Sequence, residues 1–220
     1  MVAAWAIAAP LAVLLARYYK VTPRQRWPQE LDNPFWWHAH RLLNYAALAA
    51  TALGLWLVWG AAGRDGALFR AHALAGWSVA ALALLQLAGA HLRGSKGGPT
   101  APRRAADGTP IDLAGDHYCM TPRRIRFERV HKAAGYVALA AAACTIAAGL
   151  VLADAPRWMG LVIGAWWIAL GAGAIRLQRA GRCLDTYQAI WGPDPAHPGN
   201  ARAPVGWGIR RAAPAPAPRR

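Results

Sequence analysis

Hydrophobic residues gather in five blocks along the chain, and shorter polar stretches separate them. The blocks cover approximately residues 2–16, 35–60, 68–92, 130–152 and 158–175. A run of roughly 20 apolar residues can cross a bilayer as an α-helix, and lipid favours helices because their backbone hydrogen bonds close within the segment. The pattern therefore predicts an all-α membrane protein with five transmembrane helices.

Aromatic and small residues support these helix boundaries. The chain contains 12 tryptophans, and Trp36, Trp37, Trp56, Trp59 and Trp158 lie near the ends of the blocks. Their amphipathic rings favour the headgroup region of a membrane. Glycine and alanine recur inside the blocks and allow close helix packing, so the expected partners are membrane lipid and, in a homodimer, a second copy of the chain.

The basic residues are distributed unevenly over the loops. The formal net charge of +15 could indicate a nucleic-acid partner. However, Lys and Arg gather in alternate loops, which is how membrane proteins encode their orientation. The basic loops follow the first, third and fifth blocks and include Arg17, Lys20, Arg24, Arg26, Arg93, Lys96, Arg103, Arg104, Arg123, Arg124, Arg126, Arg129, Arg176, Arg179 and Arg182. We therefore expect no nucleic-acid partner, and a bacterial cytoplasmic membrane protein with its N-terminus outside and its C-terminus in the cytoplasm.

The two ends of the chain differ in composition from its centre. The first block carries its positive charges after the apolar stretch, whereas a signal peptide carries them before it, so we expect an uncleaved helix. From about Gly192 onwards the chain is rich in Pro, Arg and Gly and ends in an Ala-Pro repeat. Such a composition buries little apolar surface. We therefore predict a membrane domain over residues 1–185 and a disordered cytoplasmic tail over residues 186–220.

Histidines carry the candidate chemistry. His40, His72 and His131 each lie near the start of a block and share one pattern: three residues, then Asn or Gly, then an aromatic residue. The small residues of this pattern are Asn44, Gly76 and Gly135. Residues i and i+4 share a helix face, so a small residue one turn after a histidine leaves room for a flat macrocycle. Histidine is the commonest metal ligand, and helix bundles build cofactor sites from facing side chains. Interfacial histidines without a cofactor are the alternative.

The direction of the helices pairs two of these histidines. Successive membrane helices run in opposite directions, which places His40 and His131 at similar depth near the cytoplasmic face. We expect them to bind one haem b between them. His72 then lies near the outer face, and its partner should come from the start of the first block, which contains no histidine.

The remaining polar candidates are weaker. His38 lies two residues from His40 on another helix face and, like His91, is expected at the membrane surface, and His117 and His197 are not expected to be ligands. Arg41 and Lys132 follow the proposed ligands directly, and either could pair with haem propionates or simply mark the cytoplasmic side. The three cysteines (Cys119, Cys144 and Cys183) form no Cys-x-x-Cys pair, so we expect no zinc site, no disulfide framework and no covalent haem attachment.

The order of these motifs resembles the cytochrome b561 family. The resemblance covers about residues 1–152 and is carried by Trp5, Pro10 and Ala16-Arg17-Tyr18, by His72 to Gly76 with Gln86 and Gly89, and by His131 to Tyr136 with Gly149-Leu150. It implies a four-helix core that holds two b-type haems and carries single electrons through the membrane, with the fifth block as an additional helix. It also implies that His40 and His131 form one ligand pair and that His72 is half of the other. The family's fourth ligand usually precedes such a first helix in a His-Gly context, and this chain begins at Met1.

Three functions follow from this interpretation. The first is a transmembrane electron carrier with at least one bis-histidine haem, because two axial imidazoles leave no open site on iron and favour electron transfer over oxygen chemistry. The second is a quinol-oxidising or ferric-reducing oxidoreductase subunit built on the same bundle. The third is a haem-free scaffold or transporter. Neither the electron donor nor the acceptor is identified by any motif.

Overall fold

The computed structural model describes residues 1–59, 66–95, 106 and 115–213. Within these residues the chain is helical and contains no β-strand, which confirms the all-α prediction. The elements in chain order are the π-helix η1 (Ala3–Ala8), α1 (Ala9–Tyr18), α2 (Phe35–Val58), α3 (Ala67–His91), α4 (Pro122–Leu152), α5 (Arg157–Arg179), α6 (Thr186–Trp191) and the 3₁₀ helix η2 (Pro198–Ala201).

Four of these helices (α2, α3, α4 and α5) are long and apolar enough to cross a membrane. Their length and composition are compatible with a multi-pass membrane protein. The first hydrophobic block forms η1 and α1, which together make a shorter apolar helix over Ala3–Tyr18. Four candidate spans, rather than five, are therefore found in the part of the chain that the structure describes.

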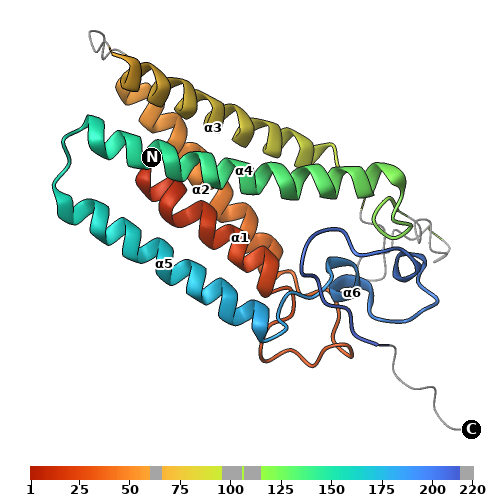
Figure 1. The fold of residues 1–220 in the computed structure, drawn as a ribbon. Helices are drawn as coiled ribbons and strands as arrows, with labels where there is room; N and C mark the ends of the chain where they lie inside the picture. Colours follow the sequence, from red (N-terminus) through yellow and green to blue (C-terminus); the bar gives the residue numbers. More distant parts are fainter. Residues whose placement is uncertain (60–65, 96–105, 107–114, 214–220) are drawn as a thin grey trace, which may run out of the picture.

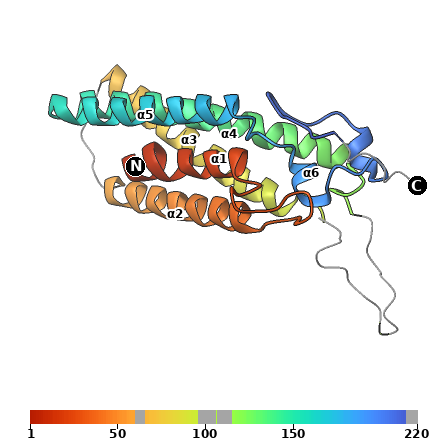
Figure 2. The same cartoon turned by 90° about the horizontal axis from the view of Figure 1, so that it is seen from below.

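The long helices lie side by side in one bundle (Figures 1 and 2). Helix α3 packs along α4. Helices η1 and α1 pack against α2, and α1 lies between α2 and α5. Helix α5 is joined to the first helix by Trp166, whose Nε1 donates to the Ala6 carbonyl at 2.8 Å. We call the end of the bundle where α6 lies the α6 end, and the opposite end the far end. Helices α2 and α4 begin at the α6 end, and α1, α3 and α5 finish there (Figure 1).

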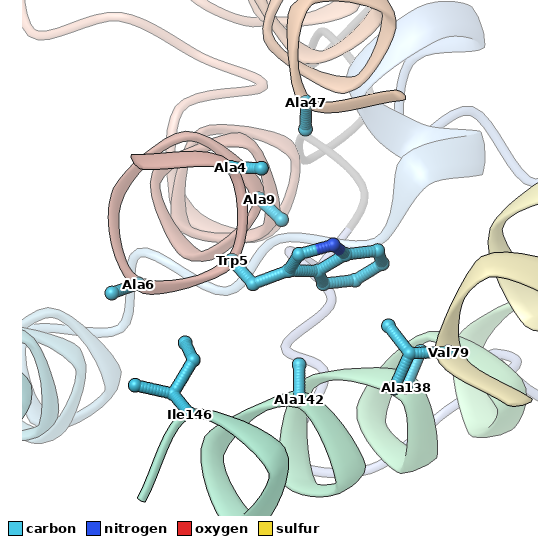
Figure 3. Packing of buried hydrophobic residues seen from close by; sticks show 9 residues of the cluster. All are labelled: Ala4, Trp5, Ala6, Ala9, Ala47, Val79, Ala138, Ala142 and Ile146. Carbon is cyan, nitrogen blue, oxygen red and sulfur yellow. The ribbon is translucent and has the colours of Figure 1, made fainter. Parts of the chain in front are cut away.

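The centre of the bundle is built from one indole and many small side chains. Trp5 is buried and donates from Nε1 to Thr51 Oγ1 at 2.9 Å, so its only polar atom is satisfied. Figure 3 shows its ring in a layer formed by Ala4, Ala6, Ala9, Ala47, Val79, Ala138, Ala142 and Ile146. Because alanine adds little bulk, the helices approach closely around the single large ring.

Residues 186–213 fold against the α6 end, which differs from the disordered tail expected from their composition. Helix α6 buries Tyr187, Ile190 and Trp191, and these side chains pack with Met120 and Val205 in a second hydrophobic cluster. Burial of these apolar side chains favours an ordered arrangement of the proline-rich stretch around them. We call residues 183–213 the cap. Residues 60–65, 96–105, 107–114 and 214–220, which include most of the Ala-Pro repeat, lie outside the described residues.

Helix α4 begins earlier than the hydrophobic pattern indicated, at Pro122 instead of about residue 130. Its first turn has ordinary start signals, because Thr121 accepts from the Arg124 backbone N–H and proline occupies the first helical position. These two extra turns are polar, so hydropathy alone did not reveal them. They carry charged side chains toward the cap.

Candidate functional site

The structure brings His40 of α2 and His131 of α4 together at the α6 end. Their ring centres are 6.3 Å apart and their planes are inclined by 70°. Metal–imidazole nitrogen bonds are about 2 Å long and a ring centre lies about 1 Å beyond the bound nitrogen, so two imidazoles on opposite sides of one metal ion have centres about 6 Å apart. The separation of the two rings is thus suited to two axial ligands.

The orientation of His40 is fixed by the first helix. Its Nδ1 lies 3.0 Å from the Ala12 carbonyl oxygen. A carbonyl can only accept, so Nδ1 carries the proton and Nε2 of the neutral ring keeps its lone pair. Metal-binding histidines characteristically donate their second ring nitrogen to a backbone carbonyl or a carboxylate in this way.

His131 is held by its neighbours on α3 and α4. Its ring stacks on Phe127 at 5.3 Å, and its backbone carbonyl accepts from Gln86 Nε2 at 2.8 Å. Its Nδ1 is buried and finds no hydrogen-bond partner among the described residues. Buried polar atoms rarely stay unsatisfied, so this nitrogen suggests a group that the protein chain does not itself provide.

The small residues of the histidine pattern contact groups on their own helix or on a neighbouring helix. Asn44 folds back on its own helix, donating to the His40 carbonyl at 2.7 Å and lying 3.5 Å from His40 Nε2. A Cβ at Gly135 would lie 3.1 Å from Gln86 Nε2, and one at Gly76 would lie 4.0 Å from Thr145 Cγ2. Gly135 and Gly76 therefore lie against side chains of neighbouring helices.

A buried carboxylate engages Lys132. The ammonium of Lys132 lies 2.8 Å from Glu128 Oε2 and also donates to the Val205 carbonyl of the cap. Glu128 Oε1 in turn accepts from Arg124 Nε at 3.0 Å. Arg41 instead lies over two aromatic rings, with its Cζ 5.5 Å from Trp37 and 5.7 Å from Tyr45. Of the two basic residues considered for propionates, Arg41 alone lacks a carboxylate partner within the described part of the chain.

His72 lies at the far end of the bundle, away from the other histidines. Its Nδ1 lies 3.1 Å from the Thr145 carbonyl, so Nδ1 is again the protonated nitrogen. The expected partner position, the start of the first block, is the apolar helix η1. Among residues 1–59, 66–95, 106 and 115–213, no second histidine lies at this end.

The sequence pattern missed one buried histidine. His117 is 1% exposed, accepts from Trp191 Nε1 at 3.2 Å and has its Nε2 3.8 Å from Glu128 Oε1. It precedes α4 and lies outside any periodic segment, so only the nearby aromatic residues could have pointed to it. His38 and His91 are exposed, as expected for surface positions. His197 Nδ1 lies 3.3 Å from the Tyr118 hydroxyl in the cap.

The donor set of the site limits the cofactors that it could hold. The described residues contain no group of three or more His, Cys, Asp and Glu side chains able to hold a metal ion. Two facing imidazoles suit a metal that brings its own remaining ligands, as haem does with four ring nitrogens. No protein-family model, no curated protein and no solved structure matches the chain.

Proposed function

We propose that the chain is a transmembrane b-type cytochrome that moves single electrons, with His40 and His131 as the axial ligands of one haem. The observation that carries this proposal is the 6.3 Å separation of the two rings. The Nδ1–H of His40 directed at Ala12 adds to it, because it leaves the opposite nitrogen available as a ligand. Two axial imidazoles favour electron transfer over oxygen chemistry.

The protein's own contribution would be to hold the two rings and exclude water. Bound haem supplies the redox couple. Ala12 fixes the His40 ring, Phe127 supports the His131 ring, and Gln86 ties α3 to α4 at this level. The alanine-rich layer around Trp5 keeps the bundle centre dry beyond the site.

The first hydrophobic helix and the uneven distribution of basic residues bear on the topology in the membrane. We infer that Ala3–Tyr18 is a fifth crossing, in a bacterial cytoplasmic membrane, with the basic α6 end in the cytoplasm. The resemblance to the cytochrome b561 family supports this arrangement. That family also implies a second haem, for which His72 would supply only one ligand. We therefore propose one haem per chain.

One observation favours the quinol-oxidising alternative. An open groove at the start of α2 is lined by Phe35, His38, Arg41, Leu42 and Tyr45, next to the proposed ligand His40. Its lining is mostly apolar with a few polar groups, which suits contact with a small lipid-like molecule. Turnover with a short-chain quinol, lost in His38→Ala while the haem is retained, would support this second function.

The test of the main proposal is a reduced-minus-oxidised absorption spectrum with pyridine haemochrome quantitation. We expect one b-type haem per wild-type chain, loss of the haem in His40→Ala and His131→Ala, and retention in His38→Ala, which is the matched control. Haem retained in His40→Ala but lost in His38→Ala would reassign the ligand. A colourless wild-type protein would overturn the proposal and favour a scaffold or transporter.

A further inference from the structure

Two guanidinium groups from different helices share one tryptophan at the α6 end. Arg93, two residues after the last residue of α3, has its Cζ 4.2 Å from the centre of the Trp37 ring. Arg41 approaches the same ring with its Cζ at 5.5 Å. The indole face attracts cations and can hold both side chains without neutralising them. Trp37 therefore gathers two guanidinium groups, neither of which forms an ion pair with a carboxylate among the described residues.

Without a bound anion, the close approach of Arg93 and Arg41 is unfavourable because both side chains are positively charged. Burial, together with the charges of Arg124 and Arg41, lowers the pKa of Arg93 to about 10. The charge of Glu128 raises the pKa of Arg93, but this carboxylate is already paired with Arg124 and Lys132. A bound anion would relieve the repulsion and gain charge-assisted hydrogen bonds.

The position of the two arginines relates them to the histidine pair. Trp37 lies one helical turn before Arg41, beside His40. On α3, Gln86 bonds the His131 carbonyl, and Arg93 follows seven residues later, roughly 10 Å nearer the α6 end at 1.5 Å per residue. Arg93 thus lies on the side of the histidine pair that faces the basic end of the bundle, and Arg41 reaches the same indole ring from α2.

We propose that Arg93 and Arg41, supported by Trp37, form the anion site for the two haem carboxylates, and that Lys132 does not take part. This inference rests on the proposed haem between His40 and His131. Lys132 is engaged by Glu128 and by the Val205 carbonyl, so it has little remaining capacity for a propionate. A phospholipid phosphate shares this oxyanion chemistry and is the competing occupant that the experiment must distinguish.

The experiment measures the rate of haem loss from the purified holoprotein to an apomyoglobin scavenger. We expect Arg93→Gln and Arg41→Gln to release haem about tenfold faster, which is the effect of losing a hydrogen bond to a charged group. Arg129→Gln is the matched control, because it removes the same charge from an exposed position on α4. It should release haem at the wild-type rate.

Haem dimethyl ester, which lacks the two carboxylates, provides the decisive comparison. We expect wild-type protein reconstituted with the ester to lose it as fast as the Arg41→Gln/Arg93→Gln double variant loses haem, and the double variant to lose both at one rate. Equal effects of the double substitution on haem and on the ester would overturn the proposal. An effect that appears only when anionic phospholipid is added would assign the site to lipid phosphate and also overturn it. A wild-type protein that binds no haem would instead refute the proposed function.

Discussion

His72 donates its Nδ1 proton to the Thr145 carbonyl across the interface of α3 and α4, over 3.1 Å. The contact is possible because Gly149 lies one helical turn after Thr145. A Cβ at Gly149 would lie 2.9 Å from His72 Cε1, closer than such atoms approach in proteins. Because Gly149 has no side chain, the His72 ring of α3 can lie against α4 at this position.

We expect Gly149→Ala to destabilise the protein although alanine is the better helix former. Alanine should gain about 0.5–1 kcal/mol in a helix interior, but the His72 ring must move and its hydrogen bond, worth about 1 kcal/mol, is lost or weakened. The measurement is the midpoint of thermal unfolding in detergent. Gly173→Ala is the control, because nothing lies within 4 Å of a Cβ at that position of α5. Its midpoint should be unchanged or higher.

A double-mutant cycle isolates the cause. In a His72→Ala background, Gly149→Ala should no longer lower the midpoint, because the ring that it displaces is absent. A loss of stability that persists in this background would show that Gly149 is needed for helix packing and not for the His72 contact.

The long helices were predictable because bilayer thickness acts locally on the chain. Helices α2, α3 and α5 follow the apolar blocks closely, and the opposite directions of successive helices predicted that His40 and His131 lie at the same end of the bundle. The position of the Asn44 side chain could not be foreseen, because it depends on a rotamer and on a local hydrogen bond. The buried His117 could not be foreseen either. Its surroundings come from residues as distant as Glu128 and Trp191, which only the folded cap brings together.

We expect Trp191→Ala to release the cap from the α6 end. Trp191 is 2% exposed and donates from its ring nitrogen to His117 Nδ1, so its removal leaves a large cavity and takes this donor away from Nδ1. Loss of a buried tryptophan typically lowers the free energy of unfolding by about 3–5 kcal/mol. Limited trypsin digestion should then cleave the cap near Arg202 and Arg211 more rapidly than in the wild-type protein.

The matched control is Trp207→Ala in the same cap. Trp207 is 82% exposed. Its backbone carbonyl accepts a hydrogen bond from the Arg17 side chain, and the substitution retains this carbonyl. The digestion rate should stay close to that of the wild-type protein. Equal protection of Trp191→Ala and wild type would show that the backbone contacts of the cap, and not the α6 cluster, hold it in place.

We expect Glu128→Gln to destabilise the start of α4 strongly. The substitution leaves Arg124, which is 7% exposed, and Lys132 without their carboxylate. Removing one partner of a buried ion pair typically destabilises a protein by about 3–5 kcal/mol. Glu30→Gln provides the control, because its ion pair with Arg26 has the same i,i+4 spacing but is exposed to solvent. Thermal unfolding of both variants should show a large shift for the first and none for the second.

Lys20 should make the stability of the protein increase in alkaline solution. It lies after α1, is 7% exposed and donates to the Arg17 and Leu184 carbonyls. Burial lowers its pKa from 10.5 to about 8, despite partial compensation by Asp185. Between these two values the unfolded chain retains the proton and the native state has released it, so stability rises with pH through this window.

In Lys20→Met the contribution of this proton is absent, and groups common to both proteins cancel in the comparison. The difference in unfolding midpoint between wild type and Lys20→Met should therefore move in favour of the wild type from pH 8 to pH 10, whereas a constant difference would show that the ammonium is hydrated in the native state.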